Sequence, residues 1–277
     1  MLCQIGLCCV YADKWNRIVL VDTSHPTTEY FRDRFSNYFG SLRRNLLLDI
    51  SGIRARLARL PVHPAELSGR LHEYAAVAGK PCGPMVDRAT GIPLTFDFTR
   101  DHDHPLLVHH TWGRSRFPLQ ALERMRLHPA LRLEVVRRMK EIGAPFTALH
   151  VRATDYQTDY RAGIAGLKDK LAGPVFVATD NRQVLDFIRA ECPDADVYSF
   201  SSLPEESRPL HDLSGQKGDV YEINRDAIVD VLMLAHAKTL YAFRLQPNPL
   251  GASLSGYSRL AFDLRNNRRL LDRLMSR

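Results

Sequence analysis

The chain has 277 residues, of which 45% are hydrophobic and 25% are charged. This is an ordinary globular composition, so disorder over the whole chain, collagen and coiled coil are excluded. No fixed-period repeat and no apolar run of about 18 residues occurs, which excludes a solenoid and a transmembrane helix.

The net charge is +7, and most of the basic residues are arginine. Because a guanidinium binds phosphate oxygens in pairs, this charge leaves nucleic acid, nucleotide-sugar and an anionic membrane open as partners. A GC-rich genome that encodes arginine in place of lysine explains it equally well. The five cysteines form no C-x-x-C pair, which argues against a disulfide framework or zinc site and favours a reducing, cytoplasmic location.

The first half of the chain predicts a helix followed at once by a strand. Leu2, Ile5, Cys9 and Ala12 keep a helical spacing within residues 1–15. The sequence RIVLVD at 17–22 is typical of a buried parallel strand, so an α/β domain has already begun. Further along we expect helices at 25–40 and 41–80 (interrupted at Pro61 and Pro64), a loop at 80–105, a short strand at 106–110 and a helix at 118–142.

The second half alternates cleanly between strands and helices. Strands are expected at 147–152, 175–179, 196–200 and 239–243, and helices at 168–171, 181–191, 226–237 and 256–276. Four strands separated by helices predict a parallel, doubly wound sheet. The last helix has a basic face of Arg265, Arg268, Arg269 and Arg273, which fits either a solvated surface or peripheral contact with anionic lipid or nucleic acid.

Polar side chains stand where these strands end, and ligands bind beyond the carboxyl ends of the strands in open parallel sheets. His150 and Arg152 end the first strand on one face, and Asp155 lies just beyond them. Asp180 follows the second strand, and serines around Ser255 open the last helix as an anion cradle. This set predicts a diphosphate site. The alternative is that His150 pairs with a carboxylate and Arg152 forms a structural salt bridge.

Four blocks in this order resemble the GDP-fucose-dependent fucosyltransferase superfamily: FTALHVRATD, VFVATDN, AIVDVLMLAHAKTLYA and SLSGYSRLAFDL. The similarity is greatest to the α1,6-fucosyltransferases, including the rhizobial nodulation fucosyltransferase, and covers residues 145–265. It implies an α/β, GT-B-like fold of two Rossmann-like domains and an inverting, metal-independent transfer. We expect an N-terminal acceptor-side domain at 1–125 and a C-terminal donor-binding domain at 126–277.

The resemblance also implies roles for particular residues. Arg152 would hold the β-phosphate of GDP and stabilise the leaving group, with His150 beside the nucleotide. Asp230 would accept hydrogen bonds from guanine, and Ser255 would bind phosphate. The alternative for Asp230 is an exposed helix acid. Three further residues match supporting positions: Asp155, Asp180 and Arg259.

An inverting transfer needs a base to deprotonate the acceptor hydroxyl. Asp159 is the expected base, although the register of the family's Glu falls on Tyr160 and a surface acid is the alternative. The cluster of Asp101, His102, Asp103, His104, His109 and His110 has ligand chemistry for a metal, but we read it as a solvated loop and expect no metal site.

The family opens with a strand and a Gly-rich loop, and Met1 falls where the helix after them begins. We therefore expect an incomplete N-terminal domain, either because the gene start is placed too late or because part of the donor site is lost. The expected function is transfer of L-fucose from GDP-fucose to a glycan hydroxyl, with no cofactor and no nucleic-acid partner. The alternatives are another nucleotide-sugar, or an inactive pseudoenzyme.

Overall fold

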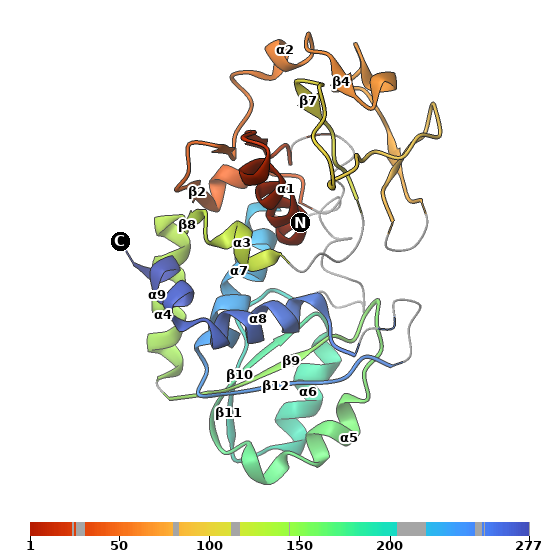
Figure 1. The fold of residues 1–277 in the computed structure, drawn as a ribbon. Coiled ribbons are helices and arrows are strands. Elements are labelled where there is room, and N and C mark those ends of the chain that lie inside the picture. The colour runs from red at the N-terminus through yellow and green to blue at the C-terminus, as the bar shows by residue number, and fades with distance from the viewer. Residues whose placement is uncertain are drawn as a thin grey trace. The chain divides into compact units, whose positions relative to one another are not determined.

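The computed structural model describes residues 1–23, 25, 31–79, 83–111, 117–143, 145–203, 220–246, 251 and 253–276. Residues 26–30 of the helix expected at 25–40, Cys82 and most of the loop at 244–252 lie outside the described residues. The chain divides into two compact units, unit 1 (Met1–Arg126) and unit 2 (Leu127–Arg277). Both contain helices and parallel strands, which confirms the α/β fold class (Figure 1).

Unit 2 is built on a four-stranded parallel sheet in the order β11-β10-β9-β12. The strands are β9 (Thr147–Val151), β10 (Gly173–Thr179), β11 (Ala195–Tyr198) and β12 (Thr239–Ala242). Each overlaps a strand predicted from the sequence. β9 and β10 are central and buried almost throughout, which is why both read as near-continuous apolar runs.

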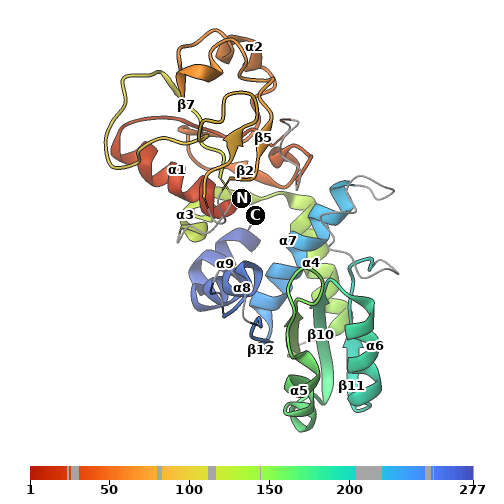
Figure 2. The ribbon, with the colours of Figure 1, turned by 90° about the vertical axis from the view of Figure 1, so that its right-hand side faces the viewer.

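The two faces of this sheet are covered by different helices. Leu149, Val151 and Val177 pack with α5 (Tyr160–Ala165) and α6 (Arg182–Glu191) in one apolar core. The other face contacts α4 (Pro129–Ile142) and α7 (Val220–His236), and α7 in turn contacts α8 (Gly256–Asn266). Figure 2 shows α6 and α8 on opposite sides of the strands. His150, between Leu149 and Val151, therefore faces α8.

Two predicted helices are each broken into separate elements. The helix expected at 118–142 consists of α3 (Pro118–Leu122), β8 (Met125–Leu127) and α4. Pro129 has no N–H and can stand only in the first turn, so α4 begins there, and Gly143 ends it with φ +79°. The helix expected at 256–276 is α8 plus α9 (Arg268–Met275), because the Asn267 side chain caps Leu270 and starts a second helix.

Unit 1 has short strands arranged in pairs. β1 (Val19–Leu20) pairs in parallel with β3 (Leu46–Leu47), and β4 (Val62–His63) pairs in parallel with β7 (Leu106–Leu107). β5 (Ala76–Val77) and β6 (Val86–Asp87) are antiparallel, and β2 (Phe39–Ser41) pairs with β8. The helical elements among its described residues are α1 (Leu2–Lys14), η1 (Phe35–Asn37), α2 (Arg54–Leu57), η2 (Ala65–Leu67) and α3.

The helical interpretation of residues 41–80 is therefore wrong. Within 41–79, the described part of this segment, only α2 and η2 are helical, and each has a single turn. Leucines in this segment fill two-residue strands and turns instead, with Leu46, Leu57 and Leu67 buried. In the described part of 25–40, η1 replaces the expected helix. At 168–171 the structure has the 3₁₀ turn η3 (Lys168–Lys170), and α5 precedes it.

Helix α1 confirms the prediction at the N-terminus, with Ile5, Cys9 and Ala12 buried. It packs against α3 so closely that a Cβ on Gly6 would lie 1.7 Å from the Phe117 carbonyl oxygen, which explains the glycine. Two adjacent cysteines, Cys8 and Cys9, lie on α1, and the described cysteines form no disulfide. Within the described ranges, no helix is both long and apolar enough to cross a bilayer.

Candidate functional site

The candidate site lies at the carboxyl end of the unit 2 sheet, where β9 and β10 end side by side. Thr179 at the end of β10 is in register with Val151 at the end of β9. The chain that leaves β9 carries Arg152 and Asp155, and the chain that leaves β10 carries Asp180. The N-terminus of α8 carries Ser255 and Ser258. The residues predicted for a diphosphate site thus come from three segments around one sheet edge.

Arg152 is held by two carboxylates. Its Nε and Nη2 donate to the two oxygens of Asp155 at 2.6 and 2.7 Å, and its Nε lies 3.2 Å from Asp180 Oδ2. A guanidinium has five N–H donors, and these contacts leave Nη1 available among the described residues. The side chain is 25% exposed, so the guanidinium remains open to solvent on one side. It can therefore receive a second anion, or exchange Asp155 for one.

Asp180 fixes the backbone that presents Arg152. It is buried, and its carboxylate accepts from the Ala153 amide at 2.9 Å and from Thr154 Oγ1 at 2.6 Å. These bonds tie the loop after β9 to the end of β10, so the direction of the Arg152 side chain is set by two strands. A structural salt bridge, the alternative considered for Arg152, is present, and it is compatible with anion binding at the remaining donors.

His150 belongs to a second cluster on the α8 side. Its Nδ1 is 2.6 Å from Ser258 Oγ, and its ring stacks on Tyr257 at a centroid distance of 4.9 Å. Ser258 Oγ is 3.0 Å from Ser255 Oγ, so the three polar groups form a chain. Burial, and then the positive charge of Arg152, lower the pKa of His150 to about 3. His150 is therefore neutral at physiological pH and adds no charge of its own to the site.

Ser255 begins α8 as its N-cap. Its Oγ accepts a hydrogen bond from the Ser258 amide at 3.0 Å, which satisfies one of the unpaired N–H groups of the first turn. The remaining amides of this turn carry the positive end of the helix dipole, which favours an anion nearby. The serines that were predicted to bind an anion thus lie at the N-terminus of α8, where Ser255 caps the helix and Ser258 contacts His150.

Ser255→Ala is expected to lower the free energy of unfolding by about 1 kcal/mol, because the cap hydrogen bond is lost. Ser255→Asn, whose side chain also caps, is expected to retain most of it. Urea unfolding of the two variants and the parent measures the difference. Equal stability of the alanine and asparagine variants would contradict a capping role.

Asp230 is buried and occupied by protein partners. One oxygen accepts from Arg138 Nη1 at 2.8 Å and the other from Ser201 Oγ at 2.6 Å. Burial raises its pKa to about 7. The alternative of an exposed helix acid is therefore wrong, because Asp230 is 5% exposed. Its carboxylate is therefore buried, and both of its oxygens are bonded to protein side chains.

The partner of Asp230, Arg138, escaped the sequence analysis. It is 1% exposed and also pairs with Asp226 and Glu134. The sequence does contain a sign that Arg138 is buried. The spacing of the apolar side of α4 places an arginine at a core position, among Leu131, Val135 and Ile142. Asp226 and Asp230 are four residues apart on the inner side of α7 and supply its counter-charge.

Two other predicted residues lie at the surface. Asp159 is exposed and caps α5 by accepting from the Ala162 amide at 3.3 Å. Arg259 is exposed in the first turn of α8. On the basic C-terminal segment, Arg265 donates to the backbone carbonyls of Ala237 and Lys238 just after α7, so this arginine has an internal structural role.

The histidine-rich segment of unit 1 is bound internally. His102 Nε2 contacts the Asp97 carbonyl at 2.9 Å, and His109 bridges Thr95 and Gln4 at 2.8 Å on each side. In the part of the chain that the structure describes, no three His, Cys, Asp or Glu side chains are grouped as metal ligands.

Acidification is expected to destabilise unit 1. Burial, followed by the charge of a neighbouring histidine, lowers the pKa of His109 and of His110 to about 4. The unfolded chain, with ordinary histidine pKa values of about 6.5, then binds more protons between those values. The stability that the neutral rings provide is complete above pH 6.5 and is lost as the pH falls toward 4. The melting temperature of His110→Gln should fall less between pH 7 and 5 than that of the parent; an equal fall would contradict the assignment.

The parallel sheet with helices on both faces defines a Rossmann-like α/β protein, and solved structures of fucosyltransferases are similar to it in fold. The structure of NodZ alpha-1,6-fucosyltransferase co-crystallized with GDP matches with a TM-score of 0.59 and 16% identity, over 95% of this chain and 87% of that chain. NodZ soaked with GDP-fucose matches with a TM-score of 0.57 and 18% identity, over 98% and 87%. The structure of Se-Met NodZ from Bradyrhizobium matches with a TM-score of 0.58 and 16% identity, over 95% of this chain and 87% of that chain.

No protein-family model and no curated protein matches the sequence. The relationship to NodZ is therefore one of fold. It confirms the Rossmann-like architecture that the sequence resemblance implied.

Proposed function

We propose that this chain is a glycosyltransferase that moves L-fucose from GDP-fucose to a hydroxyl of a glycan. The observation that supports it is the position of Arg152 at the carboxyl end of a central strand, in a fold shared with a GDP-binding fucosyltransferase. We further propose that unit 1 is the acceptor side and unit 2 the donor side, because the predicted phosphate-binding residues belong to unit 2.

Arg152 is the proposed electrostatic catalyst. As the bond between fucose C1 and the phosphate oxygen breaks, negative charge grows on the β-phosphate of GDP. The Arg152 donors that Asp155 leaves available can bind this phosphate, and the α8 N-terminus beside Ser255 adds a second positive pole. A fixed guanidinium supplies this charge without a metal ion, so the proposal includes none.

The acceptor oxygen forms its new bond to C1 on the face opposite to the departing GDP, which inverts the configuration. The acceptor proton passes to a carboxylate. Asp159 is the proposed base; it is exposed, and one of its oxygens is engaged in capping α5. Its role is tested by Asp159→Asn, which keeps the cap but cannot accept the proton. Transfer that is unchanged by this substitution assigns the proton to another group.

Guanine recognition by Asp230 is the least direct part of the proposal. Its two oxygens hold Arg138 and Ser201, although each carboxylate oxygen has a second lone pair. A contact with guanine must therefore use those lone pairs or displace Ser201. Ser201→Ala frees one oxygen without removing the buried charge, so it should leave GDP affinity unchanged or raise it if Asp230 reads the base.

Calorimetric titration of GDP, UDP and CDP, with a chelator present, tests the proposal. We expect GDP to bind at least about tenfold more tightly than UDP or CDP, since only guanine offers two adjacent donors to a carboxylate. Equal affinities would assign another nucleotide-sugar. No nucleotide binding, with steeply salt-dependent binding to random DNA, would reject sugar transfer altogether. GDP binding without release of GDP from GDP-fucose in the presence of glycans would mark a pseudoenzyme.

A further inference from the structure

His150 has one ring nitrogen inside the fold and one that a ligand can reach. Nδ1 lies 2.6 Å from Ser258 Oγ, and the ring stacks on Tyr257. The Tyr257 hydroxyl donates to the Ala227 carbonyl of α7 at 2.6 Å, so the ring is held in one orientation. Nε2 has no hydrogen-bond partner among the described residues, and His150 is 6% exposed. What Nε2 can bind depends on whether it carries the ring proton.

Two serine hydroxyls connect Nδ1 to the start of α8. Ser258 Oγ lies 2.6 Å from His150 Nδ1 and 3.0 Å from Ser255 Oγ, and each of these contacts requires one hydrogen. Ser258 has only one hydroxyl hydrogen. If it points to His150, Nδ1 is unprotonated, Nε2 carries the proton, and the Ser255 hydrogen points to Ser258. If it points to Ser255, Nδ1 carries the proton and Nε2 has a lone pair.

These are the two arrangements available at neutral pH. A doubly protonated ring is excluded there, because burial, followed by the positive charge of Arg152, lowers the pKa of His150 to about 3. In both arrangements Ser255 Oγ accepts the Ser258 amide at 3.0 Å as the cap of α8. Only in the second is the Ser255 hydrogen available to a ligand. Since phosphate oxygens accept hydrogen bonds, a phosphate bound at Ser255 selects the second arrangement.

We propose that a phosphate bound at Ser255 sets His150 as the Nδ1–H tautomer through Ser258, so that Nε2 accepts a hydrogen bond from a hydroxyl of the same ligand. Ser258 is then a positioning residue that acts through His150. This inference rests on the proposed function, which places the donor diphosphate at Ser255.

The change of tautomer conserves protons. The Ser258 hydrogen becomes bonded to Nδ1 of His150, and the Ser255 hydrogen becomes bonded to Ser258 Oγ. Ser255 receives a proton from water, and Nε2 returns one to water. The net charge of the protein stays the same, and no bond of the ligand breaks.

The tautomer determines which ligands the site favours. A ligand with both a phosphate and a nearby hydroxyl satisfies Ser255 and His150 together, as a nucleoside diphosphate does through its ribose. Inorganic pyrophosphate satisfies Ser255 but leaves Nε2 to water. The two contacts strengthen each other, because each favours the same arrangement of hydrogens.

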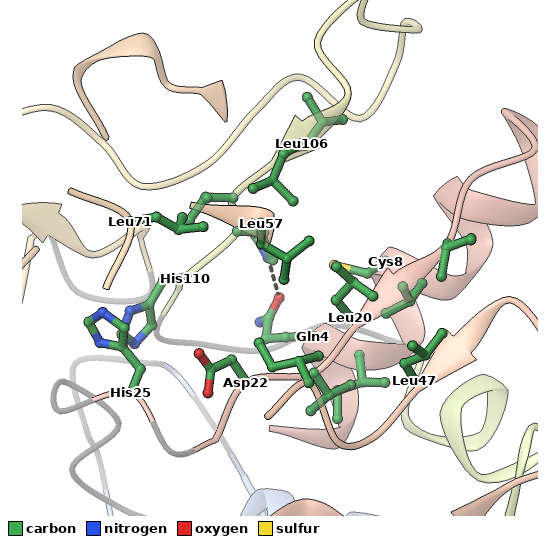
Figure 3. Close-up of a pocket in the computed structure, with 18 of the residues that line it drawn as sticks. Gln4, Cys8, Leu20, Asp22, His25, Leu47, Leu57, Leu71, Leu106 and His110 are labelled. Atoms are coloured by element: carbon green, nitrogen blue, oxygen red, sulfur yellow. Dashed lines mark hydrogen bonds between the residues drawn. The ribbon is translucent and has the colours of Figure 1, made fainter. Parts of the chain in front are cut away.

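His109 in unit 1 provides a reference for the opposite tautomer. Its Nε2 lies 2.8 Å from Gln4 Oε1, which can only accept, and its Nδ1 lies 2.8 Å from the Thr95 hydroxyl. Nε2 of His109 therefore carries the proton. Figure 3 shows the hydrogen bond of Gln4 as a dashed line in the lining of the unit 1 cavity.

The test is a long-range proton–nitrogen correlation spectrum of the full chain with isotopically labelled histidines, which separates protonated from unprotonated ring nitrogens. The loss of signals in His150→Gln assigns His150. With GDP bound at neutral pH, we expect a protonated Nδ1 and an unprotonated Nε2 at His150, and the reverse at His109. Pyrophosphate should produce the same tautomer at His150. In Ser258→Ala with GDP bound we expect Nε2 to carry the proton, because a buried Nδ1–H has lost its acceptor.

Calorimetry of the same samples adds the affinity. Ser258→Ala keeps the cap of α8, which uses the Ser258 backbone amide, and its affinity for GDP should fall by about two- to tenfold. The matched control is Ser253→Ala, which removes the hydroxyl of an exposed serine just before α8. It should leave both the tautomer of His150 and the GDP affinity as in the parent.

Two results would overturn the inference and leave the proposed sugar transfer in place. One is GDP binding to the parent with Nε2 of His150 protonated. The other is GDP binding to Ser258→Ala with Nδ1 protonated, as in the parent. A chain that binds pyrophosphate with the expected tautomer but does not bind GDP would support the inference and reject GDP-fucose as the donor. Binding of neither probe would overturn both.

Discussion

Replacing Arg152 with lysine is expected to lower the rate of fucose transfer by about 10²- to 10³-fold, the cost typical of removing one preorganised charge-stabilising donor. Lysine keeps the positive charge but cannot offer the planar fork that holds Asp155 and a phosphate together. It also leaves Asp180 with a cation nearby, so the fold is disturbed less than by alanine, which strands a buried carboxylate. GDP-fucose turnover and GDP calorimetry measure the effect.

The matched control is Arg189→Lys, an exposed arginine on α6 in the same unit, whose nearest carboxylate is 4.0 Å away. It should leave turnover and GDP affinity as in the parent. A lysine variant at 152 that melts like the parent and transfers fucose at the parental rate would remove Arg152 from the mechanism, and with it the main support for sugar transfer.

Replacing Arg138 with methionine is expected to lower the free energy of unfolding by about 3–5 kcal/mol. The side chain is 1% exposed, and its removal takes the guanidinium away from the buried Asp230 and leaves Asp226 with Arg225 alone. Burial already raises the pKa of Asp230 to about 7, and the positive charge of Arg138 opposes this rise. Loss of Arg138 therefore disfavours the charged form of Asp230 further. Urea unfolding followed by circular dichroism measures the change.

The adjacent Arg137 provides the control. It pairs with Glu134 and Glu141 at 2.8 and 2.6 Å but is 54% exposed, so Arg137→Met should cost less than about 1 kcal/mol. Adding Asp226→Asn and Asp230→Asn to Arg138→Met should recover much of the loss, because the uncompensated charges disappear. Equal effects at 137 and 138 would contradict the view that the buried cation organises α4 and α7.

Unit 2 could be predicted from the sequence because its two central strands are buried on both faces. β9 and β10 have near-continuous apolar sequences, and the neighbouring helices have an apolar side. The alternation of strands and helices can therefore be predicted without knowing which residues pair. The strand ends followed from it, and the structure places His150, Arg152, Asp155 and Asp180 around one sheet edge. The sequence places Asp230 on the helix that became α7, but it does not predict that Asp230 is buried. That burial needs the counter-charge of Arg138, which lies 92 positions away in the sequence.

Unit 1 could not be read in the same way. Strands of two residues, such as β3 and β4, are too short to show any periodicity. Their leucines and the neighbouring arginines have high helix propensity, so the local signal pointed to helix where tertiary contacts favour turns and strand pairs. The pairing partners β1 and β3, or β4 and β7, are separated by tens of residues and meet only in the folded unit.

The two adjacent cysteines of α1 have a practical consequence for handling the protein. Burial is the main cause that raises the pKa of Cys8 to about 12 and that of Cys9 to about 11. Nucleophilic attack by cysteine requires the thiolate, which is then almost absent at neutral pH. Cys9 is in addition 2% exposed, so in the folded state its sulfur should resist iodoacetamide and air, and its alkylation reports unfolding of α1.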